Sequence, residues 1–208
     1  FPTRRSSDLA AVLGGGVGGS ELALAMAYRL GPDAAVSLIE RSREIAGELP
    51  PGARRRLRAA LAERGVAVRT GTEAAAFSSE GVHTAAGETI QAGFVTAAVG
   101  ARPAPWLAES GLAVTDDGFV EVDAHLRSVS DPRVFAVGDV AHMTASPRPK
   151  AGVFAVRQGP VLHAALRAAL AGAELPTYAP QGDYLRLISL GGKRALALKY
   201  GVVAGGRG

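Results

Sequence analysis

The sequence predicts an α/β fold with a parallel sheet, and three observations lead to this expectation. Short apolar runs alternate with segments of helical spacing over the first hundred residues. Glycine- and proline-rich turns separate these runs, and a longer helical pattern follows at residues 151–170. The composition supplies a sizeable core, because 48% of the 208 residues are hydrophobic. Strands that alternate with helices are joined by right-handed crossovers, which make the strands parallel.

The first part of the chain predicts a β-α-β-α-β unit. Breaks at Gly31-Pro32-Asp33 and at Pro50-Pro51-Gly52 separate its elements, because glycine and proline interrupt helices and strands. Around these breaks the pattern predicts strands over residues 10–13, 34–39 and 66–69, and helices over residues 21–30 and 53–64.

The later part of the chain has shorter, β-rich segments. The expected elements are a hairpin over residues 81–84 and 89–92, a buried strand over 94–99, a short strand over 119–122, a buried strand over 134–137, the helix over 151–170, and two strands within 184–200 around Gly191-Gly192. Residues 172–180 are expected to form a loop, and residues 202–208 are expected to complete no element.

The glycine-rich turn after the first strand has the spacing G-x-G-x-x-G, with Gly14, Gly16 and Gly19 at its three fixed positions. Gly14 allows a tight strand-to-helix turn, Gly16 allows a pyrophosphate to approach the backbone, and Gly19 allows the helix to pack closely on the strand. The N–H groups of the turn, including those of Gly15 and Val17, can then face the phosphates at a helix N-terminus. The alternative is a glycine-rich turn in another kind of α/β protein.

An acidic residue at the end of the next strand completes the pattern. Glu40 ends the apolar run 34–39 and lies 21 residues after Gly19, which is the spacing of the dinucleotide-binding, Rossmann-like fingerprint. Its carboxylate can accept hydrogen bonds from the hydroxyls of an adenosine ribose and would repel a 2′-phosphate. NAD is therefore favoured over NADP, although Arg41 and Arg43 could pair with that phosphate and leave NADP as the alternative.

A second nucleotide-binding pattern lies in the later half. The segment Val134-Phe135-Ala136-Val137-Gly138-Asp139-Val140 is an apolar run that ends in Gly-Asp. Gly138 would allow close approach of the backbone, and Asp139 could hold a ribityl or ribose hydroxyl. Gly100 ends the preceding apolar run in a similar way.

Together, the fingerprint, Val99-Gly100 and the Gly138-Asp139 segment resemble the pyridine nucleotide-disulfide oxidoreductase superfamily, whose members have two dinucleotide-binding domains. The resemblance implies an incomplete flavoprotein fold in which the FAD domain is split in sequence around the NAD domain. It implies an NAD(P)-binding domain at residues 10–100, the returning part of the FAD domain at 101–172, and a truncated C-terminal segment at 173–208. The first half of the FAD domain would be missing.

Within this superfamily the chain is similar to type II NADH dehydrogenase-like proteins. Residues 149–159 and 183–191 point to the branch associated with selenide, water dikinase, which is therefore an expected partner. In type II NADH dehydrogenases glutamines line the quinone pocket, whereas this chain has Val153 and Arg157 there and matches only at Gln158. This departure puts quinone reduction in doubt and leaves the electron acceptor open.

The resemblance also implies the reaction and its cofactors, NAD and FAD. NADH would pass hydride to the flavin, and the helix that begins near Ala151, with Lys150 beside it, would direct positive potential at the reduced flavin. Glu21, the acid that follows Gly19 in the pattern, would be the catalytic residue near the nicotinamide, where it could position the carboxamide or relay a proton. Alternatively, Glu21 only complements the dipole of the first helix.

The two ends of the chain suggest a piece of a longer protein. Residues 1–9 resemble the translation of a sequencing-library adapter and are expected to be non-native. With half of the FAD domain absent, the chain would be an inactive fragment of an FAD-dependent NAD(P)H oxidoreductase. The alternative function is a module that binds NAD without turnover.

Charge and composition exclude several other classes. The net charge is +4, and the run Arg54-Arg55-Arg56-Leu57-Arg58 has the spacing of a solvated helix face, so a nucleic-acid partner is not expected. There are no cysteines, which excludes disulfides and thiolate metal sites, and the four histidines lack metal-ligand spacing. No apolar run is long enough to span a bilayer, and a cytoplasmic location is expected.

Overall fold

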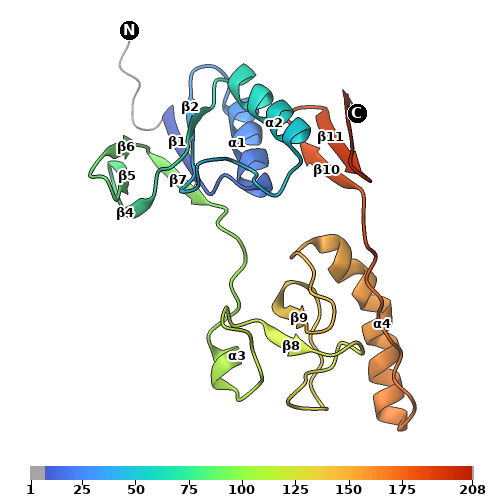
Figure 1. The fold of residues 1–208 in the computed structure, drawn as a ribbon. Coiled ribbons are helices and arrows are strands. Elements are labelled where there is room, and N and C mark those ends of the chain that lie inside the picture. The colour runs from blue at the N-terminus through green and yellow to red at the C-terminus, as the bar shows by residue number, and fades with distance from the viewer. Residues whose placement is uncertain (1–7, 208) are drawn as a thin grey trace. The chain divides into compact units, whose positions relative to one another are not determined.

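The computed structural model describes residues 8–207 and divides into two compact units. Unit 1 comprises Phe1–Gly100 and Leu185–Gly208, and unit 2 comprises Ala101–Tyr184 (Figure 1). The adapter-like residues 1–7 lie outside the described part of the chain, whereas Leu9 is already the first residue of a strand. The C-terminal residues that we expected as a separate segment are divided between the units, because residues 185–208 pack with the N-terminal part of the chain.

Unit 1 is built on a parallel sheet of strand order β3-β2-β1-β7. Its strands are β1 (Leu9–Leu13), β2 (Ala35–Ile39), β3 (Ala67–Arg69) and β7 (Phe94–Ala97). All three pairings are parallel, and β1 lies between β2 and β7. This confirms the predicted β-α-β-α-β arrangement.

Two helices connect the strands. Helix α1 (Val17–Leu30) follows β1, and helix α2 (Pro51–Glu63) follows β2. Helix α1 begins four residues earlier than the apolar pattern predicted, and it includes Gly18 and Gly19 in its first turn. Glycine is a poor helix former, so its own propensity does not explain this start. The packing of Gly19 against the preceding turn, described below, explains it instead.

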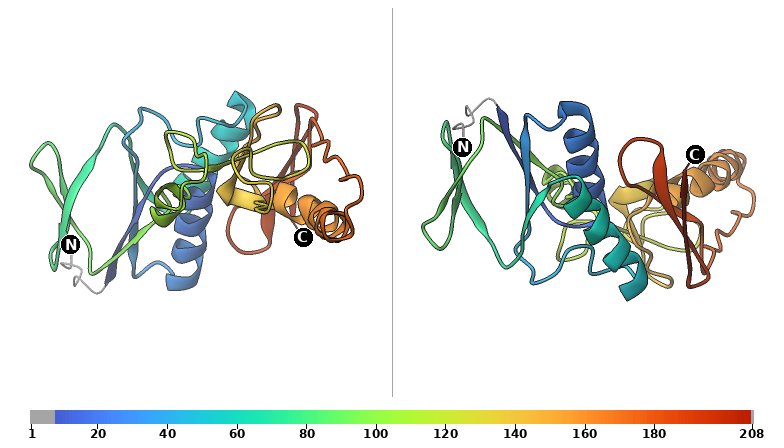
Figure 2. Two further views of the ribbon diagram at one scale, coloured as in Figure 1. Left: turned by 90° about the horizontal axis from the view of Figure 1, so that it is seen from below. Right: turned by 90° about the horizontal axis from the view of Figure 1, so that it is seen from above.

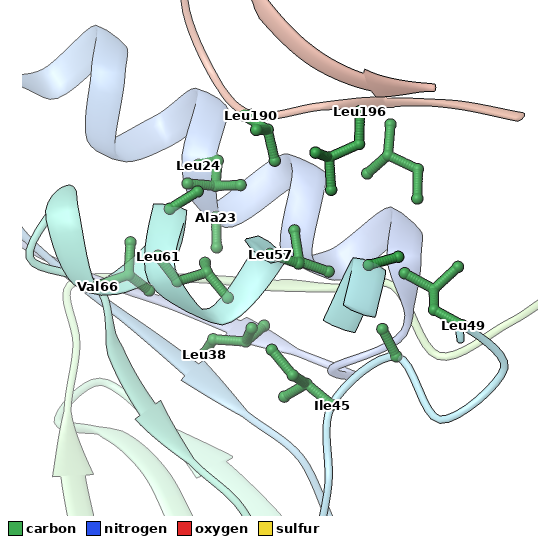
Figure 3. Close-up of a cluster of buried hydrophobic side chains, with 14 of the residues drawn as sticks. Ala23, Leu24, Leu38, Ile45, Leu49, Leu57, Leu61, Val66, Leu190 and Leu196 are labelled. Carbon is green, nitrogen blue, oxygen red and sulfur yellow. The ribbon is translucent and has the colours of Figure 1, made fainter. Parts of the chain in front are cut away.

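The helices cover one face of the parallel sheet and share a core with it (Figure 3). Val12 of β1 and Leu38 of β2 point into this core, where they meet Leu24 of α1 and Leu57 and Leu61 of α2. These five side chains are fully buried. Alternate residues of β1 and β2 face the other way, as the two-residue period of a strand requires.

The opposite face of the sheet is covered by a small antiparallel sheet of β4 (Ala74–Ser78), β5 (Gly81–Thr84) and β6 (Thr89–Gln91). Val82 and Ile90 of this sheet pack against Leu13 and Ile39 in a separate core cluster. The hairpin β5–β6 was predicted, and β4 is an additional strand that the sequence pattern did not reveal. The views in Figure 2 show this sheet on one side of the parallel strands and α1 and α2 on the other.

The end of the chain adds a further layer to unit 1. Strands β10 (Arg186–Ser189), β11 (Arg194–Lys199) and β12 (Val202–Arg207) form an antiparallel sheet. Ile188, Leu196 and Leu198 bury their side chains in the same core as α1 and α2. The expectation that residues 202–208 complete no element is therefore wrong for 202–207. A glycine-rich strand forms there because β11 supplies six paired positions, from Arg194 with Arg207 to Lys199 with Val202.

Unit 2 contains α3 (Trp106–Glu109), β8 (Val120–Val122), the 3-10 helix η2 (Gly138–Val140), β9 (Ala141–Met143) and α4 (Gly152–Ala171). Strands β8 and β9 pair in parallel, and Val120 and Val122 lie in a buried cluster with Leu126 and Met143.

Two predicted buried strands differ from the structure. Residues 134–137 form no strand. The N–H of Ser128 donates to the carbonyl oxygen of Val134, and the N–H of Ala136 donates to that of Leu126. These two bonds make a single isolated β-bridge, which is too short to count as a strand. A strand forms within the predicted range 94–99, but β7 ends at Ala97 and is not buried, since Phe94 is 56% exposed. Its place at the edge of the four-stranded sheet explains this exposure.

Candidate functional site

The glycine turn between β1 and α1 is shaped by two close backbone contacts. Gly14 has a φ of +92°, and a Cβ on it would lie 2.4 Å from the carbonyl oxygen of Ala98. A Cβ on Gly19 would lie 1.8 Å from the carbonyl oxygen of Gly14. Any larger residue at Gly19 would push the first turn of α1 away from the end of β1, so both positions require glycine for packing.

Glu40 lies at the same end of the sheet and contacts this turn directly. Its Oε2 accepts a hydrogen bond from the N–H of Gly15 at 2.5 Å, and its Oε1 accepts one from the N–H of Ser42 at 2.7 Å. A Cβ on Gly15 would lie 2.7 Å from the Cβ of Glu40, so the absent side chain makes room for the acid. Gly15 and Glu40 meet because the carboxyl ends of adjacent parallel strands share one edge of the sheet.

These contacts favour the ionised form of Glu40. Partial burial opposes the charge, but the hydrogen bonds from the N–H groups of Ser42 and Gly15 outweigh it, and the charge of Arg41 adds to their effect. The pKa of Glu40 is therefore lowered from its ordinary value. Each carboxylate oxygen can accept further hydrogen bonds, so Glu40 retains acceptor capacity for a ligand hydroxyl.

Gly16 differs from the other glycines of the turn. It has an extended conformation, with φ −62° and ψ −178°, which other residues can adopt. Among residues 8–207, the only atom beyond the adjacent residues that a Cβ there would meet within 4 Å is Oε1 of Glu48, at 3.8 Å. Neither packing nor backbone conformation in this structure requires glycine at this position.

Glu48 is a residue of this site that sequence reasoning missed. It lies in the loop between β2 and α2, and its Oε1 accepts a hydrogen bond from the N–H of Val17 at 3.1 Å. Val17 is the first residue of α1, and Gly16 provides no side-chain cap for that helix. The two partners are 31 residues apart in sequence, so no local pattern could have indicated the contact.

The remaining predicted residues of unit 1 lie around this turn or further from it. Arg41 follows Glu40 and is exposed. Glu21 is on α1, and its Oε1 accepts a hydrogen bond from the N–H of Ser189 at 2.7 Å, which joins α1 to β10. Gly100 is the last residue before unit 2, with a φ of +91° and open space where a Cβ would be.

The other predicted residues all belong to unit 2, where Gly138 and Asp139 begin the 3-10 helix η2. Gly138 has a φ of +69°, and its N–H donates to Oε1 of Gln158 at 2.7 Å. Gln158 is on α4 and is only 5% exposed. The one glutamine that matched a quinone-pocket position thus holds the Gly138-Asp139 turn, whereas Asp139 itself is exposed.

Lys150 and Ala151 lie beside this turn, immediately before α4. The Nζ of Lys150 donates to the carbonyl oxygen of Ala141 at 2.5 Å and lies 3.9 Å from the centre of the Phe119 ring. Burial lowers the pKa of Lys150, and the charge of Asp139 opposes that effect. The recess lined by Lys150, Ala151 and Asp139 has a volume of about 20 Å³.

A larger cavity of about 890 Å³, which Asp139 also lines, lies within unit 2. Most of its wall is apolar and comes from residues 101–112 and 134–140, while Arg102 and Asp131 add charge. A volume of this order is within the range of small-molecule and cofactor sites.

Two kinds of site do not occur in the part of the chain that the structure describes. Residues 8–207 contain no group of three or more His, Cys, Asp or Glu side chains that could hold a metal ion. Over the same residues, no helix combines the length and the apolar character needed to cross a membrane.

The parallel sheet, the glycine turn and the acid of the second strand define the fold class: unit 1 has the α/β, Rossmann-like fold of dinucleotide-binding proteins. The family model for pyridine nucleotide-disulphide oxidoreductases matches residues 3–159 of the chain. The chain therefore belongs to this family, and the Rossmann-like fold expected from the sequence is confirmed.

Individual relatives agree with this assignment. The chain is 38% identical over 145 residues to a dihydrolipoyl dehydrogenase of Thermus scotoductus, a match covering 62% of this chain and 30% of the relative. It is 31% identical over 148 residues to an NADH dehydrogenase-like protein of Mycobacterium tuberculosis, covering 67% and 37% respectively. The chain thus spans about a third of the length of these curated relatives.

A solved structure shows the same architecture over most of the chain. The FAD-dependent pyridine nucleotide-disulphide oxidoreductase of Desulfovibrio vulgaris superposes with a TM-score of 0.72 at 25% identity. The superposition covers 91% of this chain and 48% of that one.

Proposed function

We propose that unit 1 binds NAD(H), and that the chain is part of an FAD-dependent NAD(P)H oxidoreductase that passes hydride from NADH to flavin. The observation that carries the proposal is the contact between Gly15 and Glu40, because it fixes a carboxylate beside the glycine turn. The pyrophosphate would lie at Gly14, Gly16 and the N-terminus of α1, with the adenosine ribose at Glu40.

Gly16 supports this assignment. The fold itself leaves room for a side chain there, so a ligand that must approach the backbone closely explains why glycine is useful at this position. Gly14, Gly15 and Gly19, in contrast, are accounted for by contacts within the protein.

Glu40 supports a preference for NAD over NADP. Its carboxylate is ionised at neutral pH and held rigidly, so it would accept bonds from ribose hydroxyls and repel a 2′-phosphate. The exposed Arg41 could attract that phosphate and reduce the preference. We expect Glu40→Ala to narrow the difference between the dissociation constants of NADH and NADPH.

Unit 2 offers residues that fit a flavin. Asp139 is exposed beside a cavity large enough for a ligand, and Lys150 and the N-terminus of α4 supply positive potential next to it. A bound flavin would supply the acceptor for the hydride of NADH. Lys150 uses one of its three donors on Ala141, so two remain for a ligand.

The role of Glu21 as a catalytic residue near the nicotinamide is part of the same proposal. Its contact with Ser189 would hold the carboxylate in one orientation, which suits a group that positions a carboxamide. Glu21→Gln would keep an acceptor for the Ser189 N–H and remove the charge. In a flavin-loaded protein this variant should keep its NADH affinity and lose hydride-transfer rate.

The electron acceptor stays open in this proposal. Val153 and Arg157 stand where the resemblance to type II NADH dehydrogenases implies glutamines, which argues against a quinone. A cytoplasmic location, which fits the absence of cysteines, is part of the same proposal. Selenide, water dikinase is the partner that the resemblance of residues 149–159 and 183–191 favours. Co-purification of the two proteins from cells that express both would test this association.

A second candidate function is NAD binding without turnover. The recess around Lys150 has about the volume of one water molecule, so this recess by itself does not enclose a flavin ring. The dinucleotide residues, in contrast, all lie within unit 1.

The visible absorption spectrum and NADH binding of the purified chain separate the two functions. A bound flavin band together with NADH oxidation by an artificial acceptor would support the oxidoreductase for this polypeptide. A colourless chain that binds NADH would support the binding module, and this is the result we expect. A folded chain that has no affinity for NADH would overturn both functions. So would NADH binding that is equally strong in the original chain and in Glu40→Ala.

A further inference from the structure

The loop that carries Glu48 is anchored to the glycine turn. The N–H of Ala46 donates to the carbonyl oxygen of Gly15 at 2.7 Å, and Ile45, Ala46 and Leu49 are buried in the core of unit 1 (Figure 3). Glu48 itself is exposed between these anchors. The backbone is therefore held in place, while the side chain of Glu48 has freedom to turn.

The carboxylate of Glu48 contacts the group that an anionic ligand would use. The first N–H groups of a helix have no partner within the helix and carry a partial positive charge, which makes them an anion-binding position. In α1 the N–H of Val17 is engaged by Oε1 of Glu48 at 3.1 Å. The same oxygen lies on the open side of Gly16, 3.8 Å from where a Cβ would be.

We propose that Glu48 is an intramolecular competitor for the pyrophosphate of the dinucleotide and sets the affinity of the site. This inference rests on the proposed function of unit 1. Carboxylate and pyrophosphate are both anions and seek the same N–H, so one must leave when the other binds. The exposed side chain of Glu48 can turn away without disturbing Ile45 or Leu49. Binding therefore includes the loss of the contact between Glu48 and Val17.

The test compares ligands with and without the pyrophosphate. ADP-ribose carries the pyrophosphate, and its affinity is measured by isothermal titration calorimetry. Adenosine shares the adenine and one ribose but has no phosphate, and its weaker binding is measured by NMR. Both ligands are titrated into the full chain, its variants Glu48→Gln and Glu48→Ala, and the control variant Glu80→Gln.

Glu80→Gln is a matched control because Glu80 is also exposed, belongs to unit 1, and lies in the turn between β4 and β5. It removes the same charge from the unit without touching the glycine turn. Glu48→Gln keeps an acceptor for the Val17 N–H, so α1 retains its cap and the variant should fold as the original chain does. Circular dichroism checks that it does so.

The two Glu48 variants should bind ADP-ribose about two- to five-fold more tightly, which is the effect expected from one charge at a helix N-terminus. Adenosine binding should not change, and Glu80→Gln should match the original chain for both ligands. Equal or weaker ADP-ribose binding by the folded Glu48 variants, alongside measurable binding by the original chain, overturns this inference and leaves the proposed function intact. If neither ligand binds any of the four proteins, the proposed function fails and the inference fails with it.

Discussion

The N–H of Gly15 lies 2.5 Å from Oε2 of Glu40, although 25 residues separate them in sequence. This contact connects the turn after β1 with the end of β2, and it depends on the absence of a side chain at Gly15. The same carboxylate contributes to the fold and, in the proposed function, recognises the ribose. Its two roles can be separated by measuring stability and ligand binding in the same variants.

The acid stability of unit 1 should depend on Glu40. Its pKa is lowered in the folded chain from an ordinary value of 4.5, so the unfolded chain binds the proton more readily. The stabilisation is present above that ordinary value and is lost as the pH falls through the lowered pKa of the folded state. Urea denaturation at several pH values should show this loss. Glu40→Gln should make the free energy of unfolding depend less on pH in the acid range than it does in the original chain. An unchanged dependence would contradict a lowered pKa of Glu40.

Adjacent glycines at the start of α1 should respond in opposite ways to alanine. Gly19→Ala places a Cβ against the carbonyl oxygen of Gly14, 1.8 Å away, and should destabilise the chain by about 3 kcal/mol or more. Gly18→Ala meets nothing within 4 Å and should gain about 0.5–1 kcal/mol from helix propensity. Urea denaturation measures both. Similar effects of the two substitutions would mean that α1 does not pack on the turn as described.

Gly16 should matter for binding and not for folding. Gly16→Val adds a side chain where the protein leaves room but where the pyrophosphate would lie, so NADH affinity should fall about tenfold or more, or ~1.4 kcal/mol. Gly52→Val, in the first turn of α2, is the control, because a Cβ there meets nothing within 4 Å and Gly52 lies outside the glycine turn. Calorimetric titration with NADH tests both variants. Unchanged NADH affinity in folded Gly16→Val would place the binding site elsewhere.

The C-terminal sheet should contribute to the stability of unit 1. Leu196 is 2% exposed in the core that contains α1 and α2, so Leu196→Ala should cost about 2–5 kcal/mol. Leu187 lies on a neighbouring strand of the same sheet and is 65% exposed, and Leu187→Ala should change stability by less than about 0.5 kcal/mol. Equal urea midpoints for the two variants would show that β10–β12 does not pack on the helices.

Gln158 should stabilise the turn that carries Asp139. Gln158→Leu keeps much of the side-chain volume but leaves the Gly138 N–H without its acceptor, which should cost about 1–3 kcal/mol. Gln158→Glu keeps an acceptor oxygen but buries a carboxyl group, so it should cost least at acid pH, where that group is protonated. Hydrogen exchange at the amide of Gly138 is the direct measurement, and faster exchange is expected only in the leucine variant.

Much of the local structure follows from the sequence. The alternation of apolar runs with breaks at glycine and proline predicted the parallel unit, and the spacing from Gly14 to Glu40 predicted a Rossmann-like unit with a glycine turn after one strand and an acid after the next. Such predictions succeed because a strand or helix places its side chains at a fixed period, and because parallel strands end at one edge.

Only the tertiary structure determined the partners that lie far apart along the chain. The contacts of Glu48 with Val17 and of Gln158 with Gly138 have no local signal, since they depend on the path of the intervening loops. The pairing of β12 with β11 and the exposure of β7 likewise depend on which strand becomes a neighbour. The sequence by itself determined the dinucleotide-binding class, through three glycines and one acid at set spacing. Packing decided which anion contacts α1 in this structure, because the chain brings its own carboxylate to that N–H.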